Sequence, residues 1–187
     1  MSRWEPNARG RLEEAALELY ADRGFDETTV AEIAERAGLT ERSFFRHFAD
    51  KREVLFGGQD ALLALFVDSI AAAPQDMAPL DAVGAALASA GEFFESRHTH
   101  ARRRQAVIAA NTQLQERELI KLSSMAAAIA EALRRRGVSE SSAMLTAEAG
   151  IAVFKVAFDR WIHEGRRHQL PQFISETIDE LRAVSNS

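Results

Sequence analysis

A short segment between residues 40 and 51 holds a cluster of side chains that can bind anions or donate hydrogen bonds to another molecule. Its members are basic or carry a hydroxyl group: Thr40, Arg42, Ser43, Arg46, His47 and Lys51. Such groups are the usual partners of phosphate oxygens, and arginine is also the side chain that most often reads guanine in the major groove. The segment therefore favours recognition of a nucleic acid over catalysis.

The residues around this cluster predict two short helices joined by a turn, each helix with a cap. Thr29 precedes Glu32 by three residues, which is the spacing of a capping box. Apolar residues then recur at helical spacing, at Val30, Ile33, Ala34 and Ala37. Gly38 can end this helix in the left-handed conformation, and Thr40 is a good N-cap for the next helix, residues 41–47. A helix, a glycine-containing turn and a second, polar helix form the helix-turn-helix that enters the DNA major groove.

The same stretch resembles the N-terminal module of the TetR (tetracycline-repressor) family of bacterial transcriptional regulators. The resemblance covers residues 9–56 and rests on residues at the family's spacing: Gly24, Phe25, Thr29, Val30, Ile33, Ala34, Ala37, Gly38, Leu39, Thr40, Phe45, His47, Phe48 and Lys51. One position departs from the pattern, because the family usually has a tyrosine where this chain has Phe45. That tyrosine hydroxyl commonly meets a DNA phosphate, and the phenylalanine keeps the ring but cannot donate.

These observations assign contacts to individual side chains. We assign base-edge contact to Arg42 and place Arg46 in the same cluster, and the resemblance adds Phe45. The remaining polar residues suit phosphate contacts: Thr29, Thr40, Ser43, His47 and Lys51. For any one of these side chains, the alternative is a helix cap, a packing contact or a solvated charge.

The charge of the chain is negative overall but locally positive at the predicted turn. The net charge is −5, and residues 1–56 contain nine Lys and Arg against twelve Asp and Glu. From residue 36 to residue 52, however, five basic residues face two acidic ones. Because salt screens charges beyond about 10 Å at 0.1 M, the local balance decides the attraction to DNA. Arg3, Arg9 and Arg11 are expected to add a basic arm beside it.

Composition excludes several other classes of protein. The chain has 187 residues, 47% of them hydrophobic, and no cysteine, so it can bury a core but cannot form a disulfide or a thiolate metal site. No signal peptide or membrane-length apolar run is apparent, which predicts a cytoplasmic protein without a membrane. No phosphate loop, cofactor motif or nucleophile–base pair is visible, so we predict no enzyme and no cofactor. His98 and His100, near Glu92 and Glu95, are poorly spaced for a metal, and we predict none.

The whole chain reads as an all-α protein of about nine helices. We predict a helix-turn-helix DNA-binding domain at residues 1–56 and a helical effector-binding and dimerisation domain at residues 57–187. Helix 1 is expected at residues 8–23, and a long helix from Asp50 to about Ala73 is expected to bridge the domains. The pair Gly57-Gly58 interrupts that long helix, as a kink or as a point where another helix packs closely.

The helix expected near residues 141–163 has two apolar stripes where a surface helix needs one. The first stripe is Leu145, Ala149, Ala152 and Val156. The second stripe is Ala147, Ile151, Phe154, Phe158, Trp161 and Ile162. Either the helix is buried at the centre of its domain or one stripe meets another subunit, and we favour the subunit contact. The family resemblance implies that the last two helices of each chain form a four-helix bundle in a homodimer.

The resemblance also implies a small-molecule site in the second domain. The expected lining is aromatic or charged: Phe93, Phe94, Arg104, Met125, Phe154 and Phe158. Aromatic residues at helical spacing also make plain core, and the run Arg102-Arg103-Arg104 also suits salt bridges.

The function that we predict is a sequence-specific, ligand-responsive transcriptional repressor. Its partners would be double-stranded operator DNA, a second copy of the chain and a small-molecule effector of unknown identity. The alternative is a helical protein-interaction adaptor that does not bind DNA. The sequence does not distinguish a repressor from an activator.

Overall fold

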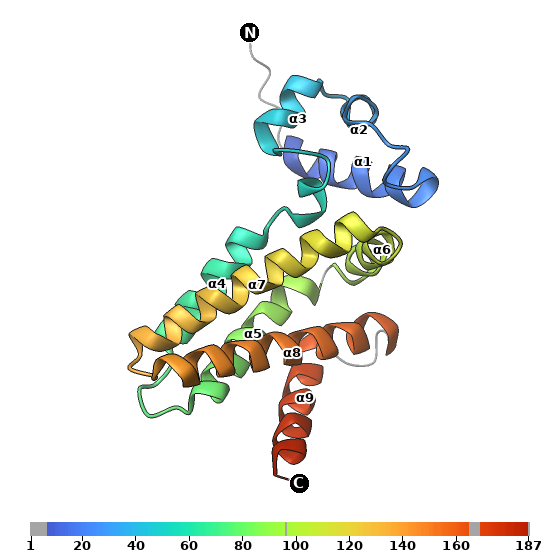
Figure 1. Cartoon of the computed structure of the whole chain (residues 1–187). Coiled ribbons are helices and arrows are strands. Elements are labelled where there is room, and N and C mark those ends of the chain that lie inside the picture. The colour runs from blue at the N-terminus through green and yellow to red at the C-terminus, as the bar shows by residue number, and fades with distance from the viewer. Residues whose placement is uncertain (1–6, 96, 165–168, 187) are drawn as a thin grey trace. The chain divides into compact units, whose positions relative to one another are not determined.

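The computed structural model describes residues 7–95, 97–164 and 169–186, and it consists of helices joined by turns (Figure 1). These ranges hold nine α-helices and one 3-10 helix, with no strand among them. The all-α prediction is confirmed. The chain divides into two compact units, one of residues 1–58 and 103–118, the other of residues 59–102 and 119–187.

The first unit contains the predicted helix-turn-helix. Its elements are α1 (Ala8–Arg23), α2 (Val30–Arg36), α3 (Glu41–His47) and the 3-10 helix η1 (Glu53–Phe56). The unit also takes the end of α6 (His98–Ala109) and the start of α7 (Thr112–Arg135). The sequence predicts residues 103–118 in the second domain, whereas the structure groups them with the first unit. The assignment of DNA binding to residues 1–56, and of effector binding and dimerisation to residues 57–187, stays a prediction.

The core of the first unit is built from the inward faces of these helices. Leu12, Leu17, Ile33 and Phe44 are fully buried. Phe25, Phe44 and Phe48 belong to one cluster, and Val107, Ile108 and Leu114 complete it. This core holds α3 through one face and leaves its other face to solvent.

The single helix predicted from Asp50 to Ala73 is wrong. η1 ends at Phe56, Gly57 is extended with φ −63° and ψ 133°, and Gly58 has φ +94°. α4 (Gln59–Ala72) begins only after this pair. A positive φ strains any residue with a Cβ, so the glycines permit a full break in the helix rather than a kink within it.

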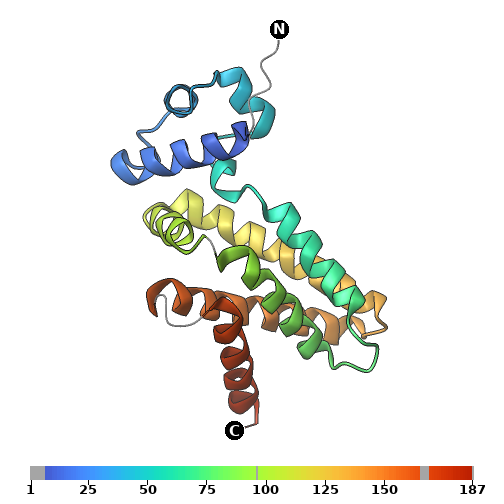
Figure 2. The ribbon, with the colours of Figure 1, turned by 180° about the vertical axis from the view of Figure 1, so that it is seen from behind.

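In the second unit, α5 (Pro79–Glu95) packs on α4, α8 (Glu140–Glu164) and α9 (Leu170–Ser185) (Figure 2). The core contains fully buried Phe66, Leu87, Ile129 and Phe173. Two stretches, Glu53–Ala72 and Glu140–Glu164, are long and apolar enough to cross a membrane by length and composition alone. The first is broken by the glycine pair, and the second contributes to this core, so we describe both as parts of packed units.

The two apolar stripes of α8 have different environments in the chain. The second stripe is buried within the unit at Ala147, Ile151, Phe154, Trp161 and Ile162, and Phe158 is half-buried. On the first stripe, Leu145 is 73% exposed and Val156 is 47% exposed. The second stripe therefore belongs to the protein's own core, and the first lies on its surface.

Candidate nucleic-acid interface

The start of α2 is fixed by the predicted capping box. The Thr29 hydroxyl accepts a hydrogen bond from the Glu32 amide at 3.3 Å, and the Glu32 carboxylate accepts from the Thr29 amide and hydroxyl at 2.9 Å each. These hydrogen bonds from Thr29 lower the pKa of Glu32. Because the Thr29 hydroxyl already donates to Glu32, its predicted phosphate contact would require that bond to break.

The turn between α2 and α3 adopts the conformation that its glycine predicts. Gly38 has φ +65°, and the amides of Gly38 and Leu39 donate to the carbonyls of Glu35 and Ala34 at 2.9 and 2.8 Å. These bonds satisfy carbonyl groups that the end of a helix leaves free. The turn is therefore closed by its own backbone.

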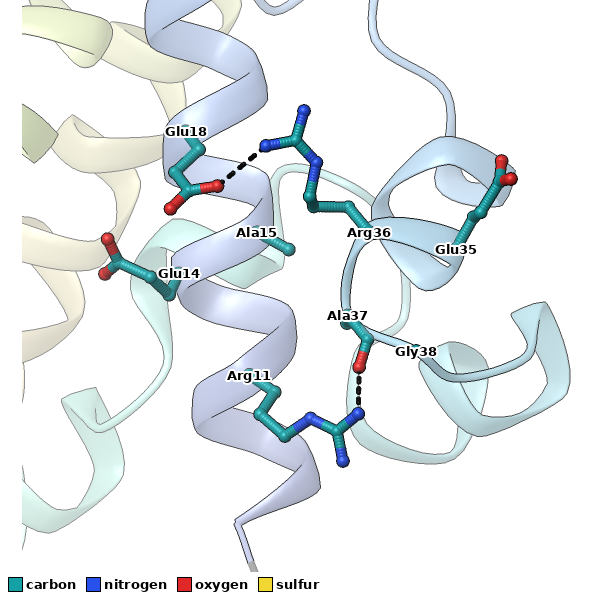
Figure 3. A pocket seen from close by; sticks show the side chains of 8 residues that line it. All are labelled: Arg11, Glu14, Ala15, Glu18, Glu35, Arg36, Ala37 and Gly38. Atoms are coloured by element: carbon teal, nitrogen blue, oxygen red, sulfur yellow. Dashed lines mark hydrogen bonds and ion pairs between the residues drawn. The ribbon is translucent and has the colours of Figure 1, made fainter.

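α1 braces this turn from the side, across a surface groove of about 410 Å³ (Figure 3). The Arg11 guanidinium donates to the Ala37 carbonyl, and Arg36 pairs with Glu18 at 3.0 Å. Sequence reasoning missed this contact of Arg11, which it had placed in a basic arm. Arg9 likewise pairs with Glu13 at 3.2 Å, and Arg3 lies outside the described residues. Two charge contacts in the groove, from Arg11 and from Arg36, therefore position the turn.

At the start of α3, two hydroxyl groups lie together. The Thr40 hydroxyl accepts from the Ser43 amide at 3.2 Å, which confirms the cap, and the two hydroxyl oxygens are 3.1 Å apart. One hydroxyl hydrogen joins the two oxygens, and the second hydroxyl hydrogen stays available to an outside acceptor.

Two arginines on α3 differ from the other basic residues nearby. Arg23, Arg36 and Arg52 pair with carboxylates at 2.6–3.0 Å. Arg42 and Arg46 are exposed, and neither has a carboxylate partner within residues 7–95, 97–164 and 169–186. They are four residues apart and so share one face of the helix. This face carries uncompensated positive charge.

Phe45 also lies on α3 and is 55% exposed. Its ring meets the buried Phe44 ring edge-on, with centroids 5.4 Å apart. It is the one aromatic side chain among the large exposed hydrophobic residues of the described ranges. The exposed surface of α3 thus presents an apolar ring beside two cations.

His47 has a more enclosed position than a phosphate contact requires. Its Nε2 atom is buried and has no hydrogen-bond partner in the part of the chain that the structure describes. Burial, and then the nearby charges of Arg46 and Arg9, lower the pKa of His47. A contact with phosphate would have to use Nδ1 or a rotated ring.

Lys51, predicted to contact a phosphate, makes its contacts within the first unit. Its ammonium donates to the carbonyls of Phe25, Asp26 and Thr28 at 2.8, 3.3 and 3.0 Å, and it lies 4.3 Å from the centre of the Phe25 ring. An ammonium has three donors, and all three are used. The Lys51 carbonyl in turn accepts from the Tyr20 hydroxyl at 2.6 Å. Lys51 therefore connects the loop between α1 and α2 to the segment after α3, and its contact with a phosphate stays a prediction.

Two family models match the sequence that forms these units. The model described as bacterial regulatory proteins of the tetR family matches residues 12–57, which contain the capped turn and α3. The model described as the MftR C-terminal domain matches residues 77–186, more than half of the chain. The chain belongs to the tetR family. It is a DNA-binding transcriptional regulator and not an enzyme, which confirms the sequence prediction and decides against the adaptor.

Individual relatives agree with the family. The chain is 26% identical to a putative mycofactocin biosynthesis transcriptional regulator, MftR, of Mycobacterium tuberculosis, over 82% of this chain and 79% of that protein. It is 35% identical to the transcriptional repressor KstR2 of the same species, over 48% of this chain and 46% of KstR2. Thermus thermophilus FadR, solved in complex with lauroyl-CoA, has a TM-score of 0.53 and 22% identity, covering 91% of both chains. At this identity, the similarity to FadR shows a shared fold.

In this tetR-family regulator, most of the residues predicted to line an effector site lie in the second unit. The rings of Phe94 and Phe158 are 5.6 Å apart, and the rings of Phe154 and Phe158 are also 5.6 Å apart. Met125 is buried in the same core at 3% exposure. The side chain of Phe93 lies outside the described residues. The aromatic residues are thus brought together, as one packed cluster.

Arg104, also predicted to line the effector site, makes its contacts within the first unit. Its guanidinium donates to the Leu55 carbonyl at 2.6 Å and to Glu118 at 3.2 Å, and it lies 4.9 Å from the centre of the Phe56 ring. Burial lowers its pKa. All of these partners belong to the first unit, so the charge is already satisfied there.

His98, one of the two histidines considered as metal ligands, contacts Trp161. The His98 Nε2 atom is 3.1 Å from the Trp161 carbonyl, and its ring meets the Trp161 ring edge-on at 4.7 Å. Within the described residues, no group of three or more ligating side chains is placed to hold a metal ion.

Proposed function

We propose that the protein is a ligand-responsive repressor that binds an operator as a homodimer and reads it with α3. The observation that carries this proposal is the exposed face of α3, where Arg42 and Arg46 have no carboxylate partner in the described ranges. Other arginines of this unit are paired with carboxylates, so a surface with two unpaired arginines is suited to an anionic partner. KstR2, a relative over about half of the chain, is a repressor.

The DNA contacts that we propose follow from the availability of each group. Arg42 reads a base edge, and Arg46 and the hydroxyl pair of Thr40 and Ser43 contact phosphates. A phosphate contact by Thr29 requires its hydroxyl to leave the cap, and one by His47 requires Nδ1 or a rotated ring, because Nε2 is buried. A phosphate contact by Lys51 requires its ammonium to leave a carbonyl, because its three donors are used within the unit.

Homodimerisation is proposed through α8 and α9. The first stripe of α8 offers Leu145 and Val156, with exposed Ala152 between them, as apolar surface that the chain does not cover. Val184 on α9 is 74% exposed. A helix-turn-helix protein that reads two half-sites needs two copies about one helical turn of DNA apart, which favours a symmetric pair.

The effector is proposed to bind in the second unit, beside the aromatic cluster of Phe94, Phe154 and Phe158. An apolar lining favours a ligand with an apolar portion, and the FadR of similar fold binds lauroyl-CoA. The effector must bind the DNA-incompetent state more tightly than the competent one to release the operator. Because an operator lies on the chromosome, we place the protein in the cytoplasm.

The test is selection of DNA by the purified full-length protein, followed by titration of the selected sequence in a gel-shift assay. We expect a sequence with two inverted half-sites and an affinity at least about 1,000-fold above that for unrelated DNA. Addition of lauroyl-CoA, as a first probe of the effector class, should release the complex. Failure to enrich any sequence would refute DNA reading by α3, whereas enrichment without release by acyl-CoA would refute the effector class alone.

A further inference from the structure

The exposed ring of Phe45 is not part of the buried core of the first unit. The ring of Phe44 behind it is fully buried, and Phe48 is 4% exposed, so the core of the unit is already filled by its neighbours. A phenylalanine that stays 55% exposed leaves apolar area in water, which is unfavourable in the free protein. A partner that binds the charged surface of α3 would cover this ring and remove its apolar area from water.

Charge identifies the class of that partner. Phe45 and Arg46 lie three and four residues after Arg42, so each of them neighbours Arg42 on the exposed surface of α3. Neither arginine has a carboxylate partner among the described residues, so a partner of this surface would have to supply negative charge beside an apolar group. DNA supplies phosphates along both edges of the major groove, and bases between them.

Only one group on the base edges of the major groove is apolar, and it is the 5-methyl group of thymine. A phenylalanine ring has no donor or acceptor, so it can neither bond to a phosphate nor read a polar base edge. Contact with a methyl group removes apolar surface of both partners from water. We propose that Phe45 is a specificity-determining residue that reads the methyl group of one thymine in each half-site. This inference rests on the proposed operator binding.

The test removes the methyl group and nothing else. In the DNA that the wild-type protein selects, each thymine in turn is replaced by deoxyuridine, and the dissociation constant is measured for the full-length protein. Loss of one buried methyl contact should weaken binding about fourfold. We expect one position per half-site to show this loss in the wild-type protein, and no loss at that position in Phe45→Ala. Phe45→Tyr keeps the ring, so deoxyuridine at that position should still weaken its binding.

Arg46→Ala is the matched control on the same helix. It should bind every sequence more weakly, yet lose the same about fourfold on deoxyuridine replacement, because its phosphate contact is separate from the methyl group. A tightly bound operator at which no deoxyuridine replacement weakens the wild-type protein would overturn the inference. So would a Phe45→Ala protein that remains as sensitive as the wild type. If no sequence is selected at all, the proposed function fails first, and the inference fails with it.

Discussion

Lys51 offers a sharp test of the structure, because its sequence context and its contacts assign it opposite roles. We consider Lys51→Met, which removes the ammonium but keeps a long, apolar side chain. In the folded protein, the variant loses three hydrogen bonds to the carbonyls of residues 25, 26 and 28. If Lys51 instead bound a DNA phosphate, the substitution would remove one contact to DNA and none within the protein.

The size of the expected change follows from the exposure of these groups. A hydrogen bond that involves a charged group contributes about 1.5–3 kcal/mol to stability. Lys51 is half-buried and the Asp26 carbonyl is exposed, so water can replace part of what is lost. We therefore expect Lys51→Met to lower the free energy of unfolding by about 2–3 kcal/mol in total, which is less than the sum of three such hydrogen bonds. That is a large share of the roughly 5–15 kcal/mol typical of a folded domain.

Two measurements on the same preparation separate the roles. Urea unfolding gives the stability, and operator binding between 50 and 200 mM salt gives the slope of affinity against salt, which falls by about 0.9 for each lost phosphate contact. We expect lower stability and an unchanged slope. Arg52→Met is the control, because Arg52 is exposed and its ion pair is with neighbouring Asp50, so its stability should change by less than about 1 kcal/mol. Unchanged stability with a reduced slope in Lys51→Met would refute the structural role.

Three further changes test other parts of the structure. Gly58→Ala should lower thermal stability by about 1–2 kcal/mol, because Gly58 has φ +94°; stabilisation would mean that the segment is helical. Ala152→Glu should give monomers in sedimentation by burying a charge at the proposed α8 contact, and a dimer that persists would exclude that stripe. His47 has a lowered pKa in the folded protein, so the unfolded chain binds its proton first, and stability should fall as pH drops through about 6.5. In urea titrations at pH 7.5 and 5.5, His47→Gln should show a smaller fall in stability than the wild type. An equal fall in both proteins would contradict the role assigned to His47.

The parts of the site that the sequence could predict are those decided by neighbouring residues. The Thr29–Glu32 box, the left-handed Gly38 and the bounds of α1 follow from capping rules that act over one helical turn. The sequence also showed two apolar stripes on one helix. Each of these features depends on residues a few positions apart, and each is present in the structure.

The parts that could not be predicted depend on contacts between distant residues. Lys51 reaches carbonyls 23–26 residues away, and Arg104 bonds to Leu55, 49 residues away. A basic side chain looks the same in sequence whether it faces a phosphate or a backbone carbonyl. The break after η1 was missed for a similar reason, because paired glycines allow a bend, a close approach or a reversal of the chain.

We propose that α3 reads operator DNA through the exposed face that Arg42 shares with Arg46. The most direct measurement is the affinity of Arg42→Ala and of the wild-type protein for the selected operator and for its single-base-pair variants. We predict a loss of about 1–3 kcal/mol on the operator and a preference that disappears at one base pair per half-site. An equal loss on every sequence would make Arg42 a phosphate contact, and no loss on any sequence would contradict the reading of DNA by this face.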